Sequence, residues 1–254
     1  MAQPKIVTPE EWLKARKALL IKEKEHMRAG DRLSAERRAL PWVKVEKAYR
    51  FDAAGGKVTL SQLFAGCSQL IVHHLMFHPD WDAACPGCSF QAEHIDGPGQ
   101  HLERRDVRII AVSRAPLAKI VAYKRRMGWR FEWVSSYGSD FNFDFRVSFP
   151  KARIGEGSVE YNFGTITVDA RYQSEELPGV SVFCRDAEDQ IFHTYSTYAR
   201  GLDALLGGNH YLDLTPKGRS NADHPNWPRR HDEYETVASG ATPVVAGGVE
   251  GNAR

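Results

Sequence analysis

The sequence is poor in cysteine and has no long apolar run. Only four of its 254 residues are cysteines, which disfavours a small secreted scaffold held together by disulfides. No run approaches the ~18 apolar residues of a membrane span. The first five residues lead into a charged segment where a secretion signal would have an apolar region. We therefore expect a cytoplasmic protein that does not bind membranes.

The sequence also lacks an excess of either charge. Thirty-four lysines and arginines stand against 32 aspartates and glutamates, which gives a net charge of +2. Because binding to nucleic acid phosphates usually needs a strongly basic surface, the composition gives no reason to expect nucleic acid as a partner. The 42% share of hydrophobic residues is ordinary for a soluble protein with one sizeable core.

One stretch, residues 78–90, carries the strongest chemical signal in the chain. It contains the sequence Cys85-Pro86-Gly87-Cys88. The segment before it, Leu70 to Phe77, is apolar and has the length of a strand buried on both faces. The segment after it, Ser89 to Ile95, is typical of the first turns of a helix. The sequence therefore predicts a strand, a short loop, a Cys-x-x-Cys pair and a helix, in that order.

This order matters because a thiol becomes a good nucleophile only after it loses its proton. An ordinary cysteine with a pKa of about 8.5 is mostly protonated at pH 7, whereas a helix start and a Cys-x-x-Cys context both lower that pKa. We expect Cys85, at the exposed helix start, to attack a disulfide, and Cys88, one turn further in, to resolve the mixed disulfide. Trp81, Pro86 and Gly87 flank the thiols and are expected to contact the substrate.

Two other interpretations of the pair remain open. One is half of a zinc site, which needs four ligands; Cys67 and Cys184 are isolated, so histidines such as His78 or His94 would have to complete it. The other is a non-catalytic binding protein that senses redox state. The predicted strand and helix around the pair favour redox chemistry. We then expect a disulfide-containing protein or small molecule as substrate, a thiol reductant as a second partner, and no cofactor.

Residues 1–44 are expected to form a helical extension. Thr8-Pro9-Glu10-Glu11 is a capping box with proline at the first helical position, so a long helix should follow. Trp12, Ala15 and Leu19 recur at helical spacing and give this helix one narrow apolar stripe. Gly30 is expected to break it, and a second short helix should then run to Leu40.

The remaining pattern predicts one domain over residues 45–219. Strands are expected at 107–113, 129–135, 180–185 and 190–195, and helices at 117–127 and 196–206. Residues 139–177 resemble an insertion that contains a hairpin about Gly164. Cys67, Cys184, His73 and His74 are expected to serve packing. The end of the chain, residues 220–254, is polar and then rich in glycine, alanine and valine, and is expected to be a flexible, disordered tail.

The chain resembles a bacterial family catalogued as domain of unknown function 899, whose members are thioredoxin-like and often described as predicted dithiol-disulfide oxidoreductases. The matching pieces are Met76-Phe77, Trp81, Cys85 to Phe90, Arg105 to Val107, Ser113 to Leu117, Met127 to Trp129, Ser135 to Asn142, Gly179 to Phe183, His193 to Ser196, Arg200-Gly201, Tyr211 to Pro216 and Gly218-Arg219. The resemblance implies an α/β thioredoxin-like fold of three layers with a mixed sheet. It also implies an oxidoreductase activity that depends on Cys85 and Cys88.

The resemblance further implies a role for a proline. In thioredoxin-like folds a cis-proline usually faces the dithiol, and we assign that place to Pro178, just before an expected sheet strand. Peroxiredoxins are the neighbouring class, and their signature has a hydroxyl residue three positions before the reactive cysteine, where this chain has Asp82. Peroxide reduction therefore ranks below disulfide exchange. Asp82 is expected either to accept a proton from Cys88 or to cap the helix.

Overall fold

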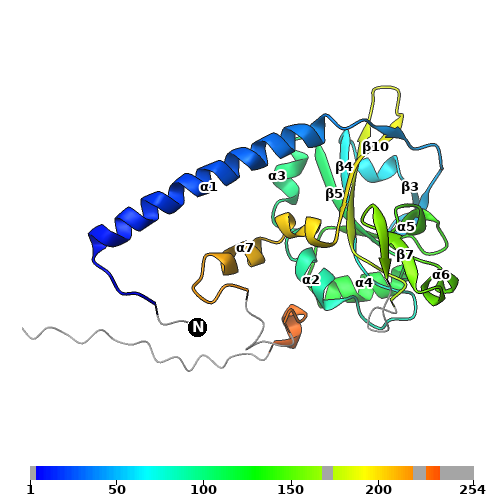
Figure 1. Ribbon diagram of the computed structural model, residues 1–254. Helices are drawn as coiled ribbons and strands as arrows, with labels where there is room; N and C mark the ends of the chain where they lie inside the picture. The colour runs from blue at the N-terminus through cyan, green and yellow to red at the C-terminus, as the bar shows by residue number, and fades with distance from the viewer. Residues whose placement is uncertain (1–3, 168–173, 220–226, 235–254) are drawn as a thin grey trace, which may run out of the picture.

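The structure, a computed structural model, describes residues 4–167, 174–219 and 227–234. Its centre is an eight-stranded mixed sheet with helices on both faces, and a long helix projects from one end (Figure 1). The strands follow along the sheet in the order β1 (Val43–Lys44), β10 (Ile191–Tyr198), β9 (Gly179–Arg185), β4 (Gln69–His74), β5 (Val107–Ser113), β6 (Glu132–Ser135), β2 (Arg50–Ala53) and β3 (Gly56–Thr59).

Strand β4 lies in the middle of this sheet. It pairs in parallel with β5 on one side and antiparallel with β9 on the other. Leu70 and Val72 on this strand have no exposed surface, as the continuous apolar pattern predicts for a strand covered on both faces. The predicted central strand and its parallel neighbour are confirmed. Regular pairing ends at His74, before the predicted end at Phe77.

Two hydrophobic clusters fill the space between the sheet and its covering elements. Helices α2 (Pro86–Ala92) and α4 (Leu117–Arg126) contribute to one cluster, which is rich in aromatic rings such as Trp129 and Trp133. A 3₁₀ helix at Gln62–Phe64 and helix α5 (Phe141–Asp144) contribute to the other, together with Phe51 and Phe183. The sheet thus has a covered core on each face, which gives three layers. Short helices α3 (Gly99–Glu103), α6 (Lys151–Gly155) and α7 (Gly207–Asp213) lie outside these clusters.

The connectivity gives the fold class. The unit β4–α2–β5 forms a parallel pair with a helical crossover, and the antiparallel strands β9 and β10 continue the sheet on the opposite side of β4. This combination, with the Cys-x-x-Cys pair where α2 begins, is a thioredoxin-like α/β fold, as the sequence predicts. The hairpin β2–β3 and the strands β6 and β1 extend the sheet at its two edges.

The N-terminal extension differs from the prediction in one respect. The capping box at Thr8 forms as expected, but helix α1 (Pro9–Arg38) runs without a break through Gly30. A single glycine costs a helix only about 1 kcal/mol relative to alanine, and helix-forming residues surround it on both sides. No residue of α1 is buried, and Trp12 and Leu19 of the predicted apolar stripe are exposed.

The expected hairpin within 139–177 is present as strands β7 (Ser158–Tyr161) and β8 (Gly164–Thr167). Its turn is formed by Asn162 and Phe163, which both have positive φ angles, as a tight two-residue hairpin turn requires. The two strands form a sheet of their own beside the main one. The hairpin therefore packs as an appendage and leaves the order of the central strands unchanged.

The C-terminal part of the chain departs further from the prediction. Strand β10 continues to Tyr198, where a helix was expected from residue 196, and a 3₁₀ helix at Ala199–Leu205 follows it. Most of the predicted tail, 220–226 and 235–254, lies outside the described residues. Residues 227–234 are described, and they pack against α2 and α4: Arg126 pairs with Asp232 at 2.6 Å, and His231 with Glu93 at 2.6 Å.

Helix α1 is long, but it is too charged to cross a bilayer. None of the helices in the described ranges has the length and apolarity that a membrane span needs.

Candidate active site

The Cys-x-x-Cys pair lies at the start of α2, after the loop that follows β4. Cys85 is the residue that precedes the first turn, and Pro86 takes the first helical position, where its missing N–H costs nothing. The Cys85 N–H donates to the Met76 carbonyl at 3.0 Å, and the Ser89 N–H and hydroxyl both donate to the Cys85 carbonyl at 2.9 Å. The backbone around Cys85 is therefore fixed from both sides. The helix starts three residues earlier than the predicted Ser89.

The two thiols are free and differ in exposure. Cys85 is half-buried, whereas Cys88 is 3% exposed and belongs to the core cluster beneath α2. A hydrogen bond from the Cys88 thiol, supported by the backbone N–H groups of Cys88 and Gly87, lowers the pKa of Cys85 to about 6 despite its burial. Most Cys85 is therefore thiolate at pH 7.

Cys88 is held in the opposite protonation state. Its pKa is raised well above the ordinary value, first because it donates to the Cys85 sulfur and then because it is buried. The Met76 N–H lies 3.3 Å from the Cys88 sulfur, where it can donate to a thiolate once one forms. The pair is thus a thiolate at the helix start with a buried, protonated thiol behind it, which is the order of pKa values that the sequence analysis expects.

An exposed glycine, Gly87, lies beside the Cys85 sulfur. A Cβ atom placed on it would lie 3.8 Å from that sulfur. Gly87 therefore places no side chain next to the Cys85 sulfur. The contact of Pro86 and Gly87 with a substrate stays a prediction.

A lysine side chain from α4 holds the loop before Cys85 in place. Lys119 of α4 donates to the carbonyls of Pro79 at 2.7 Å and Trp81 at 2.9 Å. Trp81 is half-buried and packs against the cluster beneath α2. Its ring therefore supports the loop, and its predicted contact with substrate is not tested by these packing contacts.

Asp82 does not cap α2. The residue before the helix is Cys85, and no side chain makes a capping hydrogen bond there. Asp82 is exposed, and its side chain makes no hydrogen bond with the described residues. The capping alternative is wrong because the chain turns into the helix three residues after Asp82. Proton acceptance by Asp82 stays a prediction.

Pro178 has the expected place in the sheet but not the expected peptide bond. It directly precedes β9, whose first residue, Gly179, pairs with His74 at the end of β4. Among the described residues the only cis peptide bond is at Trp227–Pro228, so the bond before Pro178 is trans. The assignment of Pro178 as a cis-proline is therefore wrong. The segment is held in its extended path because the Leu177 N–H donates to the Val147 carbonyl at 2.8 Å and the Tyr161 hydroxyl to the Pro178 carbonyl at 2.6 Å.

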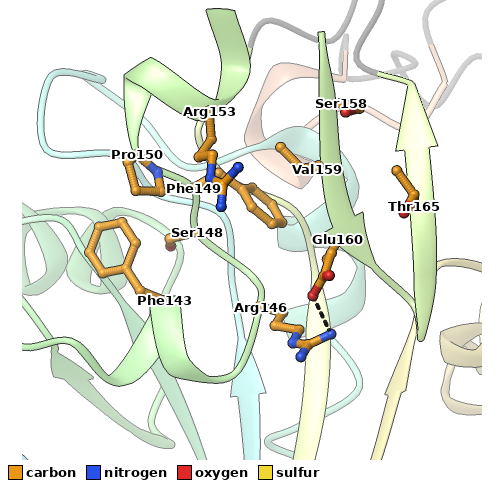
Figure 2. A pocket seen from close by; sticks show the side chains of 10 residues that line it. All are labelled: Phe143, Arg146, Ser148, Phe149, Pro150, Arg153, Ser158, Val159, Glu160 and Thr165. Atoms are coloured by element: carbon orange, nitrogen blue, oxygen red, sulfur yellow. Dashed lines mark ion pairs between the residues drawn. The ribbon is translucent and has the colours of Figure 1, made fainter. Parts of the chain in front are cut away.

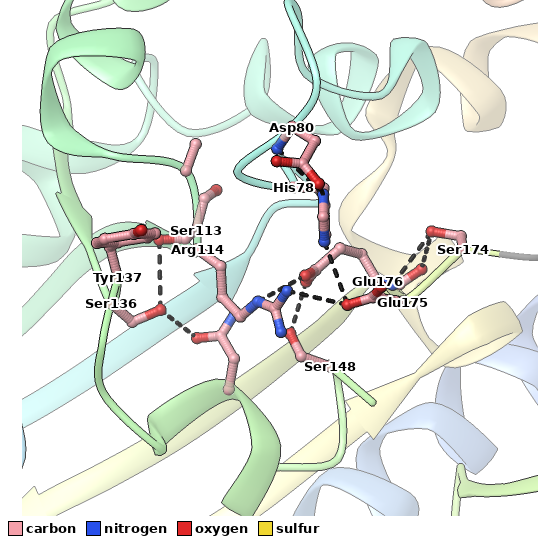
Figure 3. Close-up of polar contacts among 12 residues, drawn as sticks. His78, Asp80, Ser113, Arg114, Ser136, Tyr137, Ser148, Ser174, Glu175 and Glu176 are labelled. Atoms are coloured by element: carbon pink, nitrogen blue, oxygen red, sulfur yellow. Dashed lines mark hydrogen bonds and ion pairs between the residues drawn. The ribbon is translucent and has the colours of Figure 1, made fainter. Parts of the chain in front are cut away.

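Sequence reasoning missed a buried ionic cluster just before Pro178. Figure 3 shows Arg114, which follows β5, next to two consecutive glutamates, with His78 of the dithiol loop also beside Glu175. Glu176 is 1% exposed; it accepts a hydrogen bond from the Ser148 hydroxyl at 2.6 Å and lies 2.8 Å from the Arg114 guanidinium. Glu175 lies 3.2 Å from His78 and 3.4 Å from Arg114.

The charge of Glu176 affects the pKa of Cys88 in the dithiol. Burial raises the pKa of the Glu176 carboxyl to about 7, although Arg114 and the Ser148 hydrogen bond oppose this. Glu176 in turn is one of the groups that raise the pKa of Cys88. The only sequence signal for it was a pair of acidic residues ahead of an expected strand, which is a common surface pattern.

Sequence reasoning also missed Arg230, which lies in the predicted tail. Its Nε and Nη2 atoms donate to the Ala84 carbonyl at 3.1 and 2.7 Å. Its positive charge is among the causes that lower the pKa of Cys85. No pattern in the sequence marks this residue, because 146 positions separate it from Ala84 and its neighbours are polar residues and prolines.

A separate cavity of about 430 Å³ lies between the loop around Phe149 and the β7–β8 hairpin (Figure 2). Arg146 and Glu160 pair at 2.8 Å on its rim, and Phe143, Phe149 and Val159 contribute apolar walls. None of its lining residues belongs to the dithiol loop. It touches the site only through Ser148, which holds Glu176.

The remaining candidate residues have packing roles. His73 bonds to Gln91 at 2.8 Å and His74 to Ser181 at 3.0 Å; burial lowers the pKa of His73 to about 4 and that of His74 to about 3, so both are neutral core residues, as predicted. Cys67 and Cys184 are half-buried where full burial was expected of Cys67, and desolvation is the first cause that raises the pKa of each.

The zinc interpretation lacks a ligand set in the described part of the chain. No three side chains of His, Cys, Asp or Glu converge there as a metal site would require. His78, one of the histidines that could have completed such a site, instead lies against Glu175. The other, His94, accepts from the Gly208 N–H at 3.0 Å.

Comparison with solved structures finds shorter proteins that match about two thirds of this chain over most of their own length. Peroxiredoxin Q of Xanthomonas campestris matches with a TM-score of 0.39 at 15% identity, over 65% of this chain and 96% of that chain. Peroxidoxin BcpB of Mycobacterium tuberculosis matches with a TM-score of 0.41 at 13% identity, over 66% and 92%. A solution structure from Bacteroides thetaiotaomicron, described as a candidate protein disulfide isomerase, matches with a TM-score of 0.37 at 17% identity, over 67% and 91%.

The search of curated proteins finds no match. A family model does match, and it covers residues 1–234, from the N-terminal helix to the segment that carries Arg230. Its description is "Bacterial protein of unknown function (DUF899)". Because the match spans most of the chain, the protein belongs to this bacterial family, DUF899.

Proposed function

We propose that the protein is a dithiol-disulfide oxidoreductase that uses Cys85 and Cys88. The observation that carries the proposal is the opposite character of the two thiols. Cys85 has a pKa of about 6 and is half-buried beside Gly87, which has no side chain, whereas Cys88 is buried and protonated. A structural pair of cysteines needs neither feature. We place the activity in the cytoplasm, where thiols are kept reduced.

The first step is attack by the Cys85 thiolate on one sulfur of a substrate disulfide. The substrate S–S bond breaks, a new bond forms between Cys85 and that sulfur, and the other substrate sulfur leaves as a thiolate that takes a proton from water. The backbone N–H groups of Gly87 and Cys88 hold the attacking thiolate in place before the step.

The second step uses the buried thiol. Cys88 gives its proton to water and attacks the Cys85 sulfur; the bond between Cys85 and the substrate sulfur breaks, that sulfur leaves as a thiolate and takes a proton from water, and a Cys85–Cys88 disulfide remains. Once Cys85 is no longer an anion, the principal cause of the high Cys88 pKa is removed, and the Met76 N–H stabilises the new thiolate. Two electrons pass from the dithiol to the substrate. A small thiol or a dithiol protein then reduces the Cys85–Cys88 disulfide.

Peroxide reduction is the second candidate. The low pKa of Cys85 and the nearby second thiol favour it, because a thiolate can attack an O–O bond and Cys88 can then condense with the sulfenic acid to give the same disulfide and water. The exposed Asp82 provides no hydroxyl at the position where peroxiredoxins carry one. We therefore rank peroxide below disulfides as the oxidant.

A titration of the reduced protein with a small symmetric disulfide tests the proposal. We expect two small thiols released per chain, a disulfide that peptide mapping places between Cys85 and Cys88, and free thiols at Cys67 and Cys184. Faster oxidation by an equal concentration of hydrogen peroxide would instead favour the second candidate. Stoichiometric zinc that is lost in Cys85→Ser would support the zinc-binding alternative and contradict both.

A further inference from the structure

The segment 227–234 is attached to the helices that carry and cover the dithiol. Trp227 packs edge-on against Phe90 of α2, with 5.2 Å between ring centroids. His231 lies 2.6 Å from Glu93 at the end of α2. Asp232 accepts two hydrogen bonds from Arg126 at the end of α4, at 2.6 and 3.0 Å. These contacts fix the segment across α2 and α4 at three points.

Arg230 is the residue of this segment that reaches the dithiol loop. Its side chain is 17% exposed, and two of its guanidinium nitrogens donate to the carbonyl of Ala84, the residue immediately before Cys85. Its third nitrogen, Nη1, lies 2.7 Å from Glu233, which holds the plane of the group in this orientation. Tyr123 of α4 is the other titratable side chain that contacts it.

Arg230 binds the dithiol loop at a different place from Lys119, the other cation that contacts this loop. Lys119 binds carbonyls at Pro79 and Trp81, four or more residues before Cys85. Arg230 binds at the adjacent residue, and it is a cation that acts on the Cys85 charge. A planar guanidinium with two donors on one oxygen fixes the direction of that peptide more firmly than an ammonium could.

We propose that Arg230 is a positioning residue of the dithiol site, which the C-terminal segment 227–234 delivers to the Ala84 carbonyl and whose fixed positive charge stabilises the Cys85 thiolate. The inference rests on the proposed function of Cys85. It gives the C-terminal segment a role in reactivity, and it makes the contacts of Arg126 with Asp232 and Glu233 a means of holding that cation in place.

The test compares variants of the full-length protein in a Cys67→Ser, Cys184→Ser background. Iodoacetamide alkylation of Cys85 is followed from pH 4.5 to 9 by peptide mass spectrometry, with thermal unfolding as a check of the fold. In Arg230→Gln we expect the apparent pKa of Cys85 to rise by about one, which slows alkylation at pH 6 about fivefold. Arg230→Lys, which keeps the charge but loses the two-nitrogen contact, should fall in between.

Arg229→Gln is the matched control, because Arg229 is the neighbouring residue and its side chain is exposed. It removes the same charge and should leave the profile unchanged. An Arg230→Gln profile that equals wild type, or an Arg229→Gln shift as large as that of Arg230→Gln, would overturn the inference. If wild-type Cys85 itself reacts as an ordinary thiol, the proposed function fails, and that failure is visible without any variant.

Asp232→Asn gives a second test that does not alter Arg230. Loss of a nearby negative charge would by itself lower the pKa of Cys85. The proposal predicts instead that the pKa of Cys85 rises, because the loss of the contact with Arg126 loosens the segment that holds Arg230. An increase in the pKa of Cys85 supports the inference, and a decrease contradicts it.

Discussion

At the scale of single residues, the site depends on groups whose protonation is set by their surroundings. Cys85 has a lowered pKa, whereas Cys88 and Glu176 have raised ones. The two sulfurs differ because one donates to the other and lies deeper in the core. Glu176 differs from ordinary surface glutamates because it is buried with a single arginine and one hydroxyl as partners.

The buried carboxyl of Glu176 predicts a pH dependence of stability. Its pKa in the folded protein is about 7, above the ordinary glutamate pKa of 4.5. Between these values the folded state binds a proton that the unfolded state does not, so this group's contribution to stability is full below pH 4.5 and is lost as the pH rises through 7. The shift corresponds to at most about 3 kcal/mol.

Urea unfolding at pH 5 and pH 8 measures this effect. Relative to wild type, Glu176→Gln should lose less stability between the two pH values, because the glutamine has no proton to lose. The matched variant Glu175→Gln, at the half-exposed neighbouring position, should keep most of the wild-type dependence, because Glu175 is a lesser cause of the raised Glu176 pKa than burial. Parallel pH profiles for wild type and Glu176→Gln would show that this carboxyl is not the group responsible.

At the scale of elements, local sequence predicted the strand, the dithiol and the helix because each depends on near neighbours. The capping box of α1 and the β7–β8 hairpin were predictable for the same reason. Arg230 and Glu176 were not, because their roles come from contacts with residues far away in the chain. The trans bond before Pro178 was missed because its assignment came from the family resemblance and not from the residues around it.

Substitution by alanine should have different effects at Gly30, inside a helix, and at Gly128, directly after a helix. Gly30 lies inside the exposed helix α1 with open space around it, so Gly30→Ala should raise helix content with little change in the melting temperature of the domain. Gly128 follows α4 with a φ of +66°, so Gly128→Ala should destabilise the domain by about 1 kcal/mol. Circular dichroism and thermal unfolding separate the two. A drop in melting temperature for Gly30→Ala would mean that α1 packs more closely than its exposure indicates.

At the scale of the whole molecule, four separate parts of the chain contribute residues to the dithiol site. The start of α2 carries the thiols, α4 holds the preceding loop through Lys119, the segment before β9 brings Glu176, and residues 227–234 bring Arg230. The thioredoxin-like core alone explains only the position of the part that carries the thiols. The long helix α1 contributes no buried residue and has no contact with the dithiol in the described structure.

The most direct measurement of the central claim is the mass of each single-cysteine variant after exposure to a small disulfide. Cys88→Ser should accumulate a mixed disulfide on Cys85, because attack proceeds and resolution cannot. Cys85→Ser should form no adduct on the buried Cys88 and should keep its fold, and Cys67→Ser and Cys184→Ser should turn over like wild type. An adduct on Cys88 in Cys85→Ser, equal in yield to that on Cys85 in Cys88→Ser, would contradict the account.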